Sequence, residues 1–348
     1  MNKRVTIKQI AIELNVSMMT VSRALNDRSN VDSRTKQRVL ETAARLGYKP
    51  NYVAKSLALN KTFSIGVVFP EISHSFFPEV IKGIERVASK NEYQLILSYT
   101  AENQSREIQA LQTLESKRVD GILISMAQDV DNTDHYKVLI DDGIPLTFFD
   151  RCATGLGASC VRIDDYQSAL LVMKHLMGLG YEKIAHLHGP VELELGRQRL
   201  EGYKDAMKSG NLSFREEWLV ESGFSEKGGY EAMNNILALR KPDMPEAVMC
   251  VNDPVAIGAM EAISLAGLKV PDDIAITGFT DDVRAKLIRV PLTTIEQPTY
   301  AIGKKAARKL LRHIASKDEE VEDIVLDTRL IVRESCGARK KSEKLSVL

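Results

Sequence analysis

Hydrophobic residues follow two different periodicities along the chain. In roughly the first sixty residues they recur at the i, i+3, i+4 spacing of helices, whereas from residue 63 onward short apolar runs alternate with amphipathic stretches. The first pattern predicts a small all-α region. The second predicts strands that alternate with helices, which is typical of parallel α/β folds.

The first predicted helix begins after Thr6, which can form a capping box with Gln9. Asn15 follows this helix, and Asn is the residue best tolerated after glycine in a left-handed turn. The chain is therefore expected to turn sharply here. The residues at helical spacing that should face inward are Ile7, Ile10, Ala11 and Leu14.

Two further helices would complete a compact unit. Ser17 suits the N-cap of a second helix, and a third helix is expected to start at Asp32 and to stop at Gly47. Their expected inward residues are Val21, Ala24, Leu25, Val39, Ala43 and Leu46. A helix, a tight turn, a second helix and a supporting third helix make a helix-turn-helix unit. The second helix of such a unit enters the major groove of DNA.

Charge is distributed unevenly, although the formal net charge of the chain is zero. Residues 1–61 contain 12 Lys and Arg but 4 Asp and Glu, a balance of +8, so the remaining residues carry −8. A basic head on a larger acidic body predicts a polyanionic partner for the head alone.

The outward face of the second helix carries the candidate contacts to DNA. Arg23 can make a bidentate contact to guanine O6 and N7. Met18 and Met19 accept hydrogen bonds only weakly, so we expect them to press on thymine methyl groups or pyrimidine edges. The alternative interpretation is a surface helix with ordinary hydroxyls. Polar side chains that can position the protein on phosphates are Thr6, Ser17, Thr20, Ser22, Asn26 and Asn30.

A third short segment, YKPNYVAKSLALNKT at residues 48–62, predicts a helix between the head and the body. Pro50 suits its first turn. A helix of about ten residues is marginal in isolation. It would need a partner, which could be the same helix of a second copy, the DNA, or both. Its narrow apolar stripe consists of Val53, Ala54, Leu57 and Ala58.

The runs VTIKQIAIELNVSMMTVSRALN and RVLETAARLGYKPNYVAKSLA resemble the DNA-binding head and hinge of the LacI/GalR family of bacterial transcription regulators. The resemblance implies that Met18, Met19 and Arg23 are base readers. It also implies that Leu57 enters a central base step from the minor groove and kinks the DNA, and that the hinge orders only on operator binding. The implied hinge residues are Asn51, Val53, Ala54 and Leu57.

The body of the chain contains eight apolar runs before residue 280. Because they are continuous rather than alternating, they predict parallel strands in sheets that are covered on both faces. Eight such strands are more than one sheet readily accommodates. A final run at 324–335 is expected to return to the second of two sub-domains. The eight runs are 64–70, 93–99, 121–125, 144–150, 160–165, 183–189, 247–253 and 274–279.

The family resemblance implies how the body is divided, because these regulators resemble periplasmic sugar-binding proteins. The chain would cross between two periplasmic-binding-protein-like sub-domains near 151–160, near 288–293 and near 322. The last residues show no heptads for a tetramerising coiled coil, so we expect a dimer. The expected boundaries are a head at 1–49, a hinge at 50–62, an effector domain at 63–337 (sub-domains about 63–158 with 291–322, and 160–288 with 324–337) and a disordered tail at 338–348.

Ligands of such folds bind at the carboxyl ends of strands, between the lobes. The first strand is followed by PEISHSFFPEV, which lacks the glycine-rich loop of a dinucleotide site. Phe76 and Phe77 could lie against the apolar face of a sugar ring, or they could simply pack under the start of a helix.

Further candidates come from strand ends and from the family pattern. The resemblance implies effector roles for Arg199, for Phe224 and for the pair Asn252 and Asp253. The full set of predicted effector residues is His74, Phe76, Phe77, Ser125, Asp150, Arg151, Asp164, Arg199, Phe224, Asn252, Asp253, Thr280 and Asp281.

One departure from the family pattern concerns GFTDD at residues 278–282, where relatives commonly carry Asp or Asn directly after GF. Either Asp281 takes that role or the ligand differs. Arg151 and Arg199 together suggest an acidic sugar such as a hexuronate. The alternative is that each arginine simply pairs with Asp150 or Asp164.

Several other classes of protein are disfavoured. There is no secretory signal and no apolar run of about 20 residues, and no GxSxG, HExxH or P-loop motif is present. His186 and His188 would point to opposite faces of a strand, which makes them poor co-ligands of a metal. No enzyme activity, cofactor or metal is therefore expected. The four cysteines are expected to be buried reduced thiols of a cytosolic protein: Cys152, Cys160, Cys250 and Cys336.

The sequence thus predicts a cytoplasmic, nucleoid-associated repressor. It would act as a homodimer on palindromic operator DNA under the control of a small sugar or sugar acid. Whether the effector releases or strengthens DNA binding stays open. The alternatives are a non-enzymatic sugar carrier, which the head argues against, and an enzyme with an accessory DNA-binding head.

Overall fold

A computed structural model describes residues 5–25, 31–48, 61–130, 132–316 and 318–338. The chain divides into two compact units, 1–62 and 63–348. The predictions for Asn26, Asn30, Asn51, Val53, Ala54 and Leu57 lie outside the described residues, as does the predicted tail from residue 339.

The described residues of the first unit form the helices α1 (Ile7–Leu14), α2 (Met18–Leu25) and α3 (Ser33–Leu46). The predicted capping box is present, since the backbone N of Thr6 donates to Gln9 Oε1 at 2.8 Å and that of Gln9 donates to Thr6 Oγ1 at 3.4 Å. Asn15 has a φ of 51°, which confirms the left-handed turn. The helices enclose a small apolar core of Ile10, Ala11, Val21, Ala24, Val39 and Ala43.

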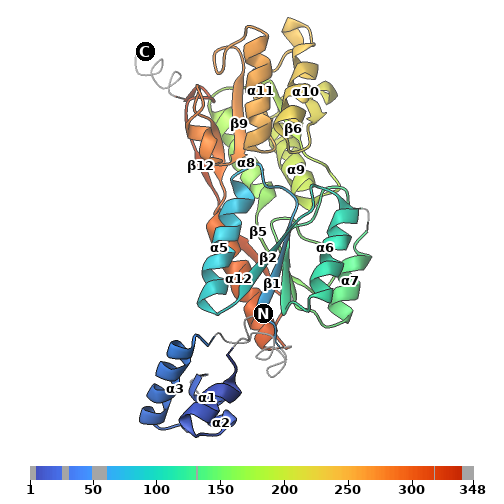
Figure 1. Cartoon of the computed structure of the whole chain (residues 1–348). Coiled ribbons are helices and arrows are strands. Elements are labelled where there is room, and N and C mark those ends of the chain that lie inside the picture. Colours follow the sequence, from blue (N-terminus) through green and yellow to red (C-terminus); the bar gives the residue numbers. More distant parts are fainter. Residues whose placement is uncertain (1–4, 26–30, 49–60, 131, 317, 339–348) are drawn as a thin grey trace. The chain divides into compact units, whose positions relative to one another are not determined.

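The second unit contains two six-stranded sheets (Figure 1). The first sheet has the order β11-β5-β4-β3-β1-β2 and is parallel throughout. Its strands are β1 (Ser64–Phe69), β2 (Gln94–Tyr99), β3 (Gly121–Ile124), β4 (Leu146–Phe149), β5 (Ser159–Ile163) and β11 (Asp323–Leu326).

The second sheet has the order β12-β10-β9-β8-β6-β7, in which only β12 runs antiparallel to its neighbour. Its strands are β6 (Ile184–His188), β7 (Leu219–Glu221), β8 (Ala247–Cys250), β9 (Ala275–Thr280), β10 (Thr293–Glu296) and β12 (Arg329–Ile331).

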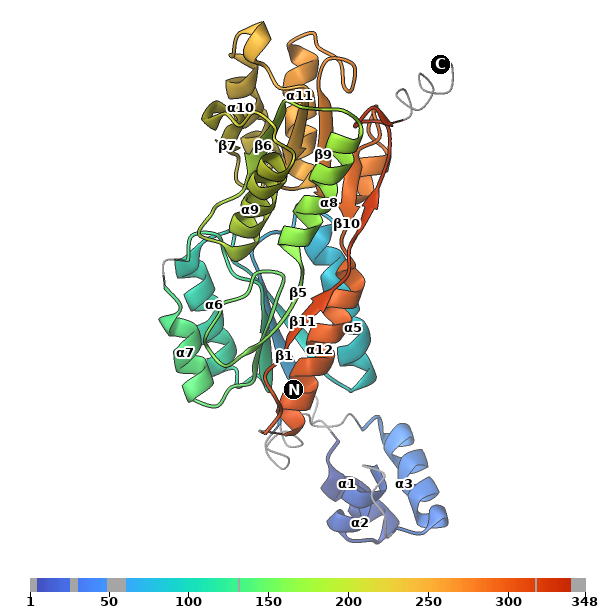
Figure 2. The same ribbon diagram turned by 180° about the vertical axis from the view of Figure 1, so that it is seen from behind.

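Helices cover both faces of both sheets, as Figures 1 and 2 show. Around the first sheet, α5 (Phe76–Lys90) and α12 (Thr299–Ala315) pack together, and α6 (Gln104–Ser116) and α7 (Asp134–Asp141) cover the other face. Around the second, α8 (Asp165–Gly178) packs on α9 (Glu194–Ser209), and α10 (Glu226–Leu237) packs on α11 (Asp253–Leu265). Three 3-10 helices span Glu216–Trp218, Lys241–Asp243 and Val283–Lys286.

The chain passes between the sheets three times, each time a few residues later than expected. Strand β5 pairs with β4 in the first sheet, although residues from 160 were expected in the second sub-domain. Strand β10 belongs to the second sheet instead of the first. The final run is split, because β11 joins the first sheet and β12 the second. Apolar runs predict buried strands but do not say which of two equally covered sheets each strand joins.

The cysteine prediction is wrong for one pair, because Cys152 and Cys160 form a disulfide. They follow and begin adjacent parallel strands, which brings their Cα atoms to 6.0 Å of each other. Cys250 and Cys336 are buried free thiols. No helix among the described residues is long and apolar enough to cross a membrane.

Candidate functional site

The first candidate site is the outer face of α2. Met18 and Met19 are 56% and 62% exposed, and Arg23 is also exposed, whereas Val21 and Ala24 on the opposite face are buried. Large apolar side chains that are this exposed are stabilised when a binding partner covers them. The helix therefore presents two thioethers and one guanidinium to a partner.

The hydroxyl groups beside this face are pre-organised by the helix ends. Ser17 Oγ accepts a hydrogen bond from the backbone N of Thr20 at 3.0 Å and lies 2.8 Å from Thr20 Oγ1. Thr6 Oγ1 lies 3.2 Å from Gln9 Oε1, and Ser22 is half-buried. Capping thus fixes the predicted phosphate contacts at the N-terminal ends of α1 and α2, where helix N-termini favour anions.

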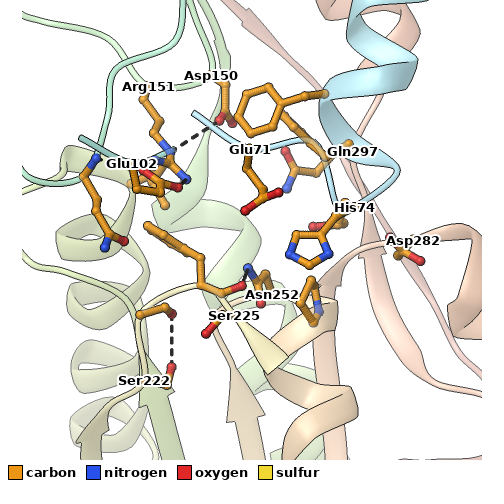
Figure 3. Close-up of a pocket in the computed structure, with 18 of the residues that line it drawn as sticks. Glu71, His74, Glu102, Asp150, Arg151, Ser222, Ser225, Asn252, Asp282 and Gln297 are labelled. Atoms are coloured by element: carbon orange, nitrogen blue, oxygen red, sulfur yellow. Dashed lines mark hydrogen bonds and ion pairs between the residues drawn. The ribbon is translucent and has the colours of Figure 1, made fainter. Parts of the chain in front are cut away.

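The second candidate site is a cavity of about 330 Å³ between the two sheets, at the carboxyl ends of strands from both (Figure 3). Nine predicted effector residues line it: His74, Phe76, Phe77, Asp150, Arg151, Arg199, Phe224, Asn252 and Thr280. Ser125, Asp164, Asp253 and Asp281 do not line it.

Asp150 and Arg151 follow β4 and form one wall of the cavity. Asp150 has a φ of 61°, a left-handed conformation that non-glycine residues rarely adopt and that is common at functional sites. The Arg151 guanidinium makes two hydrogen bonds to Glu102, at 2.7 and 3.0 Å, and another to the Met126 carbonyl at 3.2 Å. The Arg151 guanidinium lies over the ring of Phe224, with its Cζ atom 4.5 Å from the ring centroid.

Arg199 in α9 is held in the opposite wall by Asp165. Its Nε and Nη2 lie 2.8 and 2.7 Å from the same carboxylate oxygen, and Nη1 donates to the Val251 carbonyl at 2.5 Å. The predicted Asp164 instead accepts the backbone N–H of Gln167 at 2.9 Å as the N-cap of α8. An N-cap side chain turns back onto its own helix, so the next carboxylate is the one that reaches the arginine.

Asp253 supports the cavity without lining it. It is fully buried, and its carboxylate accepts hydrogen bonds from Thr294 Oγ1 at 2.6 Å and from the backbone N of Asp282 at 2.7 Å. These bonds fix the turn Thr280–Asp282, in which Asp281 has a φ of 60°. Gly278 is required beside it, because a Cβ there would lie 2.1 Å from the Asp253 oxygen.

The GFTDD departure is resolved by Asp282. Asp281 turns away from the cavity to pair with Arg333 at 2.7 Å. Asp282 lines the cavity and accepts hydrogen bonds from the backbone N and Oγ of Ser75, at 3.1 and 2.9 Å, across from the other lobe. Of the two aspartates that follow Thr280, Asp282 rather than Asp281 therefore lines the cavity.

Phe76 and Phe77 line the cavity and also pack in the protein interior. Phe76 and Phe77 are 9% and 5% exposed and contact each other edge to face, with centroids 5.0 Å apart. Phe77 also packs on Phe69 and Phe149, so it is part of the core as well as the wall. Ser125 lies fully buried beyond them, with no hydrogen-bond partner for its hydroxyl among the described residues.

Asn252 positions the remaining aromatic residue. Its side-chain amide donates to the Phe224 carbonyl at 2.9 Å, and its oxygen caps α11 by accepting from the Val255 backbone N. Both ends of the amide are therefore used to hold the loop that carries Phe224.

Burial sets the ionisation of the carboxylates here. Burial raises the pKa of Asp150 to about 7, although the Arg151 charge works in the opposite direction. Burial likewise raises the pKa of Asp253 to about 7, against the hydrogen bond from Thr294. Burial would raise the pKa of Asp282 as well, but hydrogen bonds from Arg284 and Ser75 outweigh it and lower that pKa to about 2.

Comparisons with known proteins agree with this architecture. Residues 6–51 match the family model for bacterial regulatory proteins of the lacI family, and residues 173–336 match that for a periplasmic binding protein-like domain. The HTH-type transcriptional repressor PurR of Mannheimia succiniciproducens is 34% identical over 95% of this chain and 98% of its own length. The probable HTH-type transcriptional repressor ExuR of Bacillus subtilis is 36% identical over 95% and 98%. This chain belongs to the LacI family.

Solved structures of transcription regulators have the same fold. The lac repressor dimer bound to operator and the anti-inducer ONPF matches with a TM-score of 0.84 and 26% identity, over 96% of this chain and 99% of that one. A complex of the transcriptional regulator CelR with cellobiose matches with a TM-score of 0.72 and 27% identity, over 95% and 100%. As a LacI-family member, the chain is a DNA-binding transcription regulator with an effector-binding domain.

Sequence reasoning missed about half of the cavity wall. Several missed residues share one signal, because Glu71, Glu102, Ser222 and Gln297 each follow shortly after a strand. Applying the strand-end rule to every strand would have found them. The missed residues are Glu71, Glu102, Gln128, Leu195, Ser222, Gly223, Ser225, Pro254, Asp282 and Gln297.

Proposed function

We propose that this chain is a cytoplasmic repressor that binds palindromic operator DNA as a homodimer and whose operator affinity is set by a sugar or sugar acid in the cavity. The observation that carries the proposal is one chain with both an exposed face of Met18, Met19 and Arg23 on the second helix of its head and a cavity lined by carboxylates and aromatic rings. Such a lining suits a ligand with many hydroxyls and an apolar ring face.

In this proposal the head makes two kinds of contact with DNA, one with base edges and one with the backbone. Arg23 reads guanine in the major groove, and Met18 and Met19 contact thymine methyl groups or pyrimidine edges. The capped hydroxyls of Ser17 and Thr20 place the helix on the backbone. The exposure of the three readers on one face of α2 supports this assignment.

Ligand binding would act on DNA through the lobes. The cavity takes residues from both sheets, and Gln297 in its wall follows β10, where the chain leaves the second sheet for α12. A ligand that contacts both lobes changes their relative position, and such coupling between sites is typically worth about 1–3 kcal/mol.

The test begins with selection of binding sites from random duplex DNA by the full-length protein. Anisotropy titrations on the selected site are then repeated with a panel of sugars, sugar acids and phosphosugars. We expect a palindromic site and at least one compound that changes its affinity several-fold. If no palindrome is enriched, with or without ligand, the proposal is wrong.

A further inference from the structure

Both guanidinium groups in the wall of the cavity are already engaged by carboxylates. Arg151 has a bidentate partner in Glu102, at 2.7 and 3.0 Å, and Arg199 has Asp165 at 2.7 Å. Arg151 and Arg199 are 6% and 3% exposed, so these pairs lie in a medium of low polarity where they are screened little. Among the described residues of the wall, an anionic ligand therefore meets no unoccupied guanidinium.

Glu102 is placed on Arg151 by an unusual backbone. Ala101 and Glu102 both have left-handed φ values, 54° and 57°, directly after β2. The Glu102 carboxylate also accepts the backbone N–H of Gln128 at 2.9 Å. Non-glycine residues keep this conformation only where the surroundings impose it, so the loop is built to hold this carboxylate against the arginine.

The remaining charges of the wall are unfavourable to an anion. Four carboxylates line the cavity, Glu71, Glu102, Asp150 and Asp282, against the guanidiniums of Arg151 and Arg199. Figure 3 shows Glu71, Glu102 and Asp150 around the same opening. A ligand carboxylate or phosphate would have to displace Glu102 or share its arginine, at the cost of like charges in a partly dehydrated site.

Asp150 offers what a neutral ligand needs. Among the described residues, the partner of its carboxylate is Arg151 Nε at 3.9 Å, which is beyond hydrogen-bond range, and that Nε has no hydrogen-bond partner although it is buried. The Asp150 carboxylate lines the cavity and keeps some exposure, so a ligand hydroxyl can donate to it. Because the positive charge of Arg151 already stabilises the Asp150 carboxylate, a neutral hydroxyl donor is enough to complete the hydrogen bonding of that carboxylate.

We propose that Glu102 is a specificity-determining residue that occupies Arg151, excludes sugar acids and phosphosugars, and restricts the cavity to uncharged polyhydroxylated effectors. This inference rests on the proposed function and narrows its ligand class. It also decides against the hexuronate that the two arginines suggested in the sequence.

The test compares ligands that differ only in charge. Isothermal titration of the full-length protein uses matched pairs, glucose with glucuronate and galactose with galacturonate, together with glucose 6-phosphate. We expect the wild type to bind the neutral member of a pair at least about tenfold more tightly than its acid. In Glu102→Gln the released arginine should raise affinity for the acids by about tenfold or more, while neutral affinity changes less.

Three variants separate this role from a structural one. Glu102→Asp keeps the charge and should keep the neutral preference. Glu231→Gln removes an exposed carboxylate that does not line the cavity, so it should leave the preference as in the wild type. Arg151→Gln combined with Glu102→Gln should lose the gained acid affinity. Folding of each variant is checked by the fluorescence of Trp218, the single tryptophan of the chain, which is buried in this unit.

Each outcome decides the matter. A wild type that prefers the acids, a Glu102→Gln variant that gains nothing for them, or a lack of response of both proteins to every probe would overturn the inference. Binding of acids by Glu102→Gln alone would support the exclusion. Operator selection with the wild type is scored separately, so a sugar acid that alters operator binding sinks this inference and leaves the proposed function intact.

Discussion

The head and the cavity hold their functional side chains in opposite ways. On α2 the three candidate base readers are exposed, and no internal hydrogen bond or ion pair holds their tips within the described residues. In the cavity, Arg151 and Arg199 are almost completely buried, each in contact with a carboxylate, a backbone carbonyl and an aromatic ring.

The difference follows from what each site must recognise. DNA supplies its own charge and its own donors and acceptors, so a side chain that contacts DNA can stay exposed and hydrated until the DNA binds. A small ligand in a dry cavity needs polar groups that are already oriented, because ordering them on binding costs affinity. Substitutions in the cavity should therefore affect stability as well as binding, whereas those on α2 should affect binding alone.

The largest effect is expected for Asp165→Ala. It leaves Arg199 buried beside an apolar gap, and breaking a buried ion pair typically costs about 3–5 kcal/mol. Urea unfolding followed by Trp218 fluorescence reports this unit. The matched control is Glu231→Ala, which removes the exposed pair with Lys227 and should cost less than about 1 kcal/mol. Equal losses in the two variants would contradict the contrast.

Next in size is Arg23→Ala, which should weaken binding to the selected operator by about 1–3 kcal/mol and relax the preference at one guanine. The Trp218 unfolding midpoint should not move. Arg38→Ala, an exposed arginine on α3, removes the same charge and should leave the base preference as it is. A sharp guanine preference that survives in Arg23→Ala would assign the reading to another residue.

Effector affinity should depend on pH through Asp150, whose pKa is raised to about 7. Above this pH the carboxylate is ionised and accepts hydroxyl donors, whereas below it the bound proton must first be lost. Affinity for an uncharged ligand should therefore fall as pH drops from 8 to 6, by at most about tenfold per unit. Titrations of Asp150→Asn should have a shallower slope over the same range, with the remainder due to Asp253, whose pKa is also raised to about 7; a slope as steep as that of the wild type would place the titrating group elsewhere.

The smallest effects are expected for Met18→Ala and Met19→Ala, each below about 1 kcal/mol in operator affinity, because thioethers make soft contacts to apolar base features. The change should appear as altered preference at thymine positions when sites are selected again. If both variants select the same half-site as the wild type, the methionines do not read bases.

Much of the head could be predicted from the sequence because its determinants are local. Thr6 with Gln9, Asn15, Asp32 and Gly47 act within one or two turns of helix, and each has the predicted role in the structure. Helical periodicity likewise identified the buried face of α2. The predicted apolar runs of the body also correspond to strands, since continuous apolar runs are typical of parallel strands. Strands β7 and β10 were not predicted.

Local sequence patterns did not predict which of the two sheets each strand joins. Strands β5, β10 and β11 lie in different sheets from those expected, because the choice depends on pairing with distant strands. The same holds for the disulfide between Cys152 and Cys160, whose spacing in the sequence gave no sign of adjacency in the sheet.

The cavity shows most clearly which features the sequence determined and which depended on the tertiary structure. The sequence by itself determined that arginines, carboxylates and aromatic residues gather at strand ends, which is a property of the fold class. Only the tertiary structure decided that Glu102 engages Arg151, that Asp165 rather than its neighbour engages Arg199, and that Asp282 rather than Asp281 lines the cavity. Those choices depend on which way a side chain points after a cap or a left-handed turn, and on charges brought together from distant segments. Local sequence signals do not contain this information.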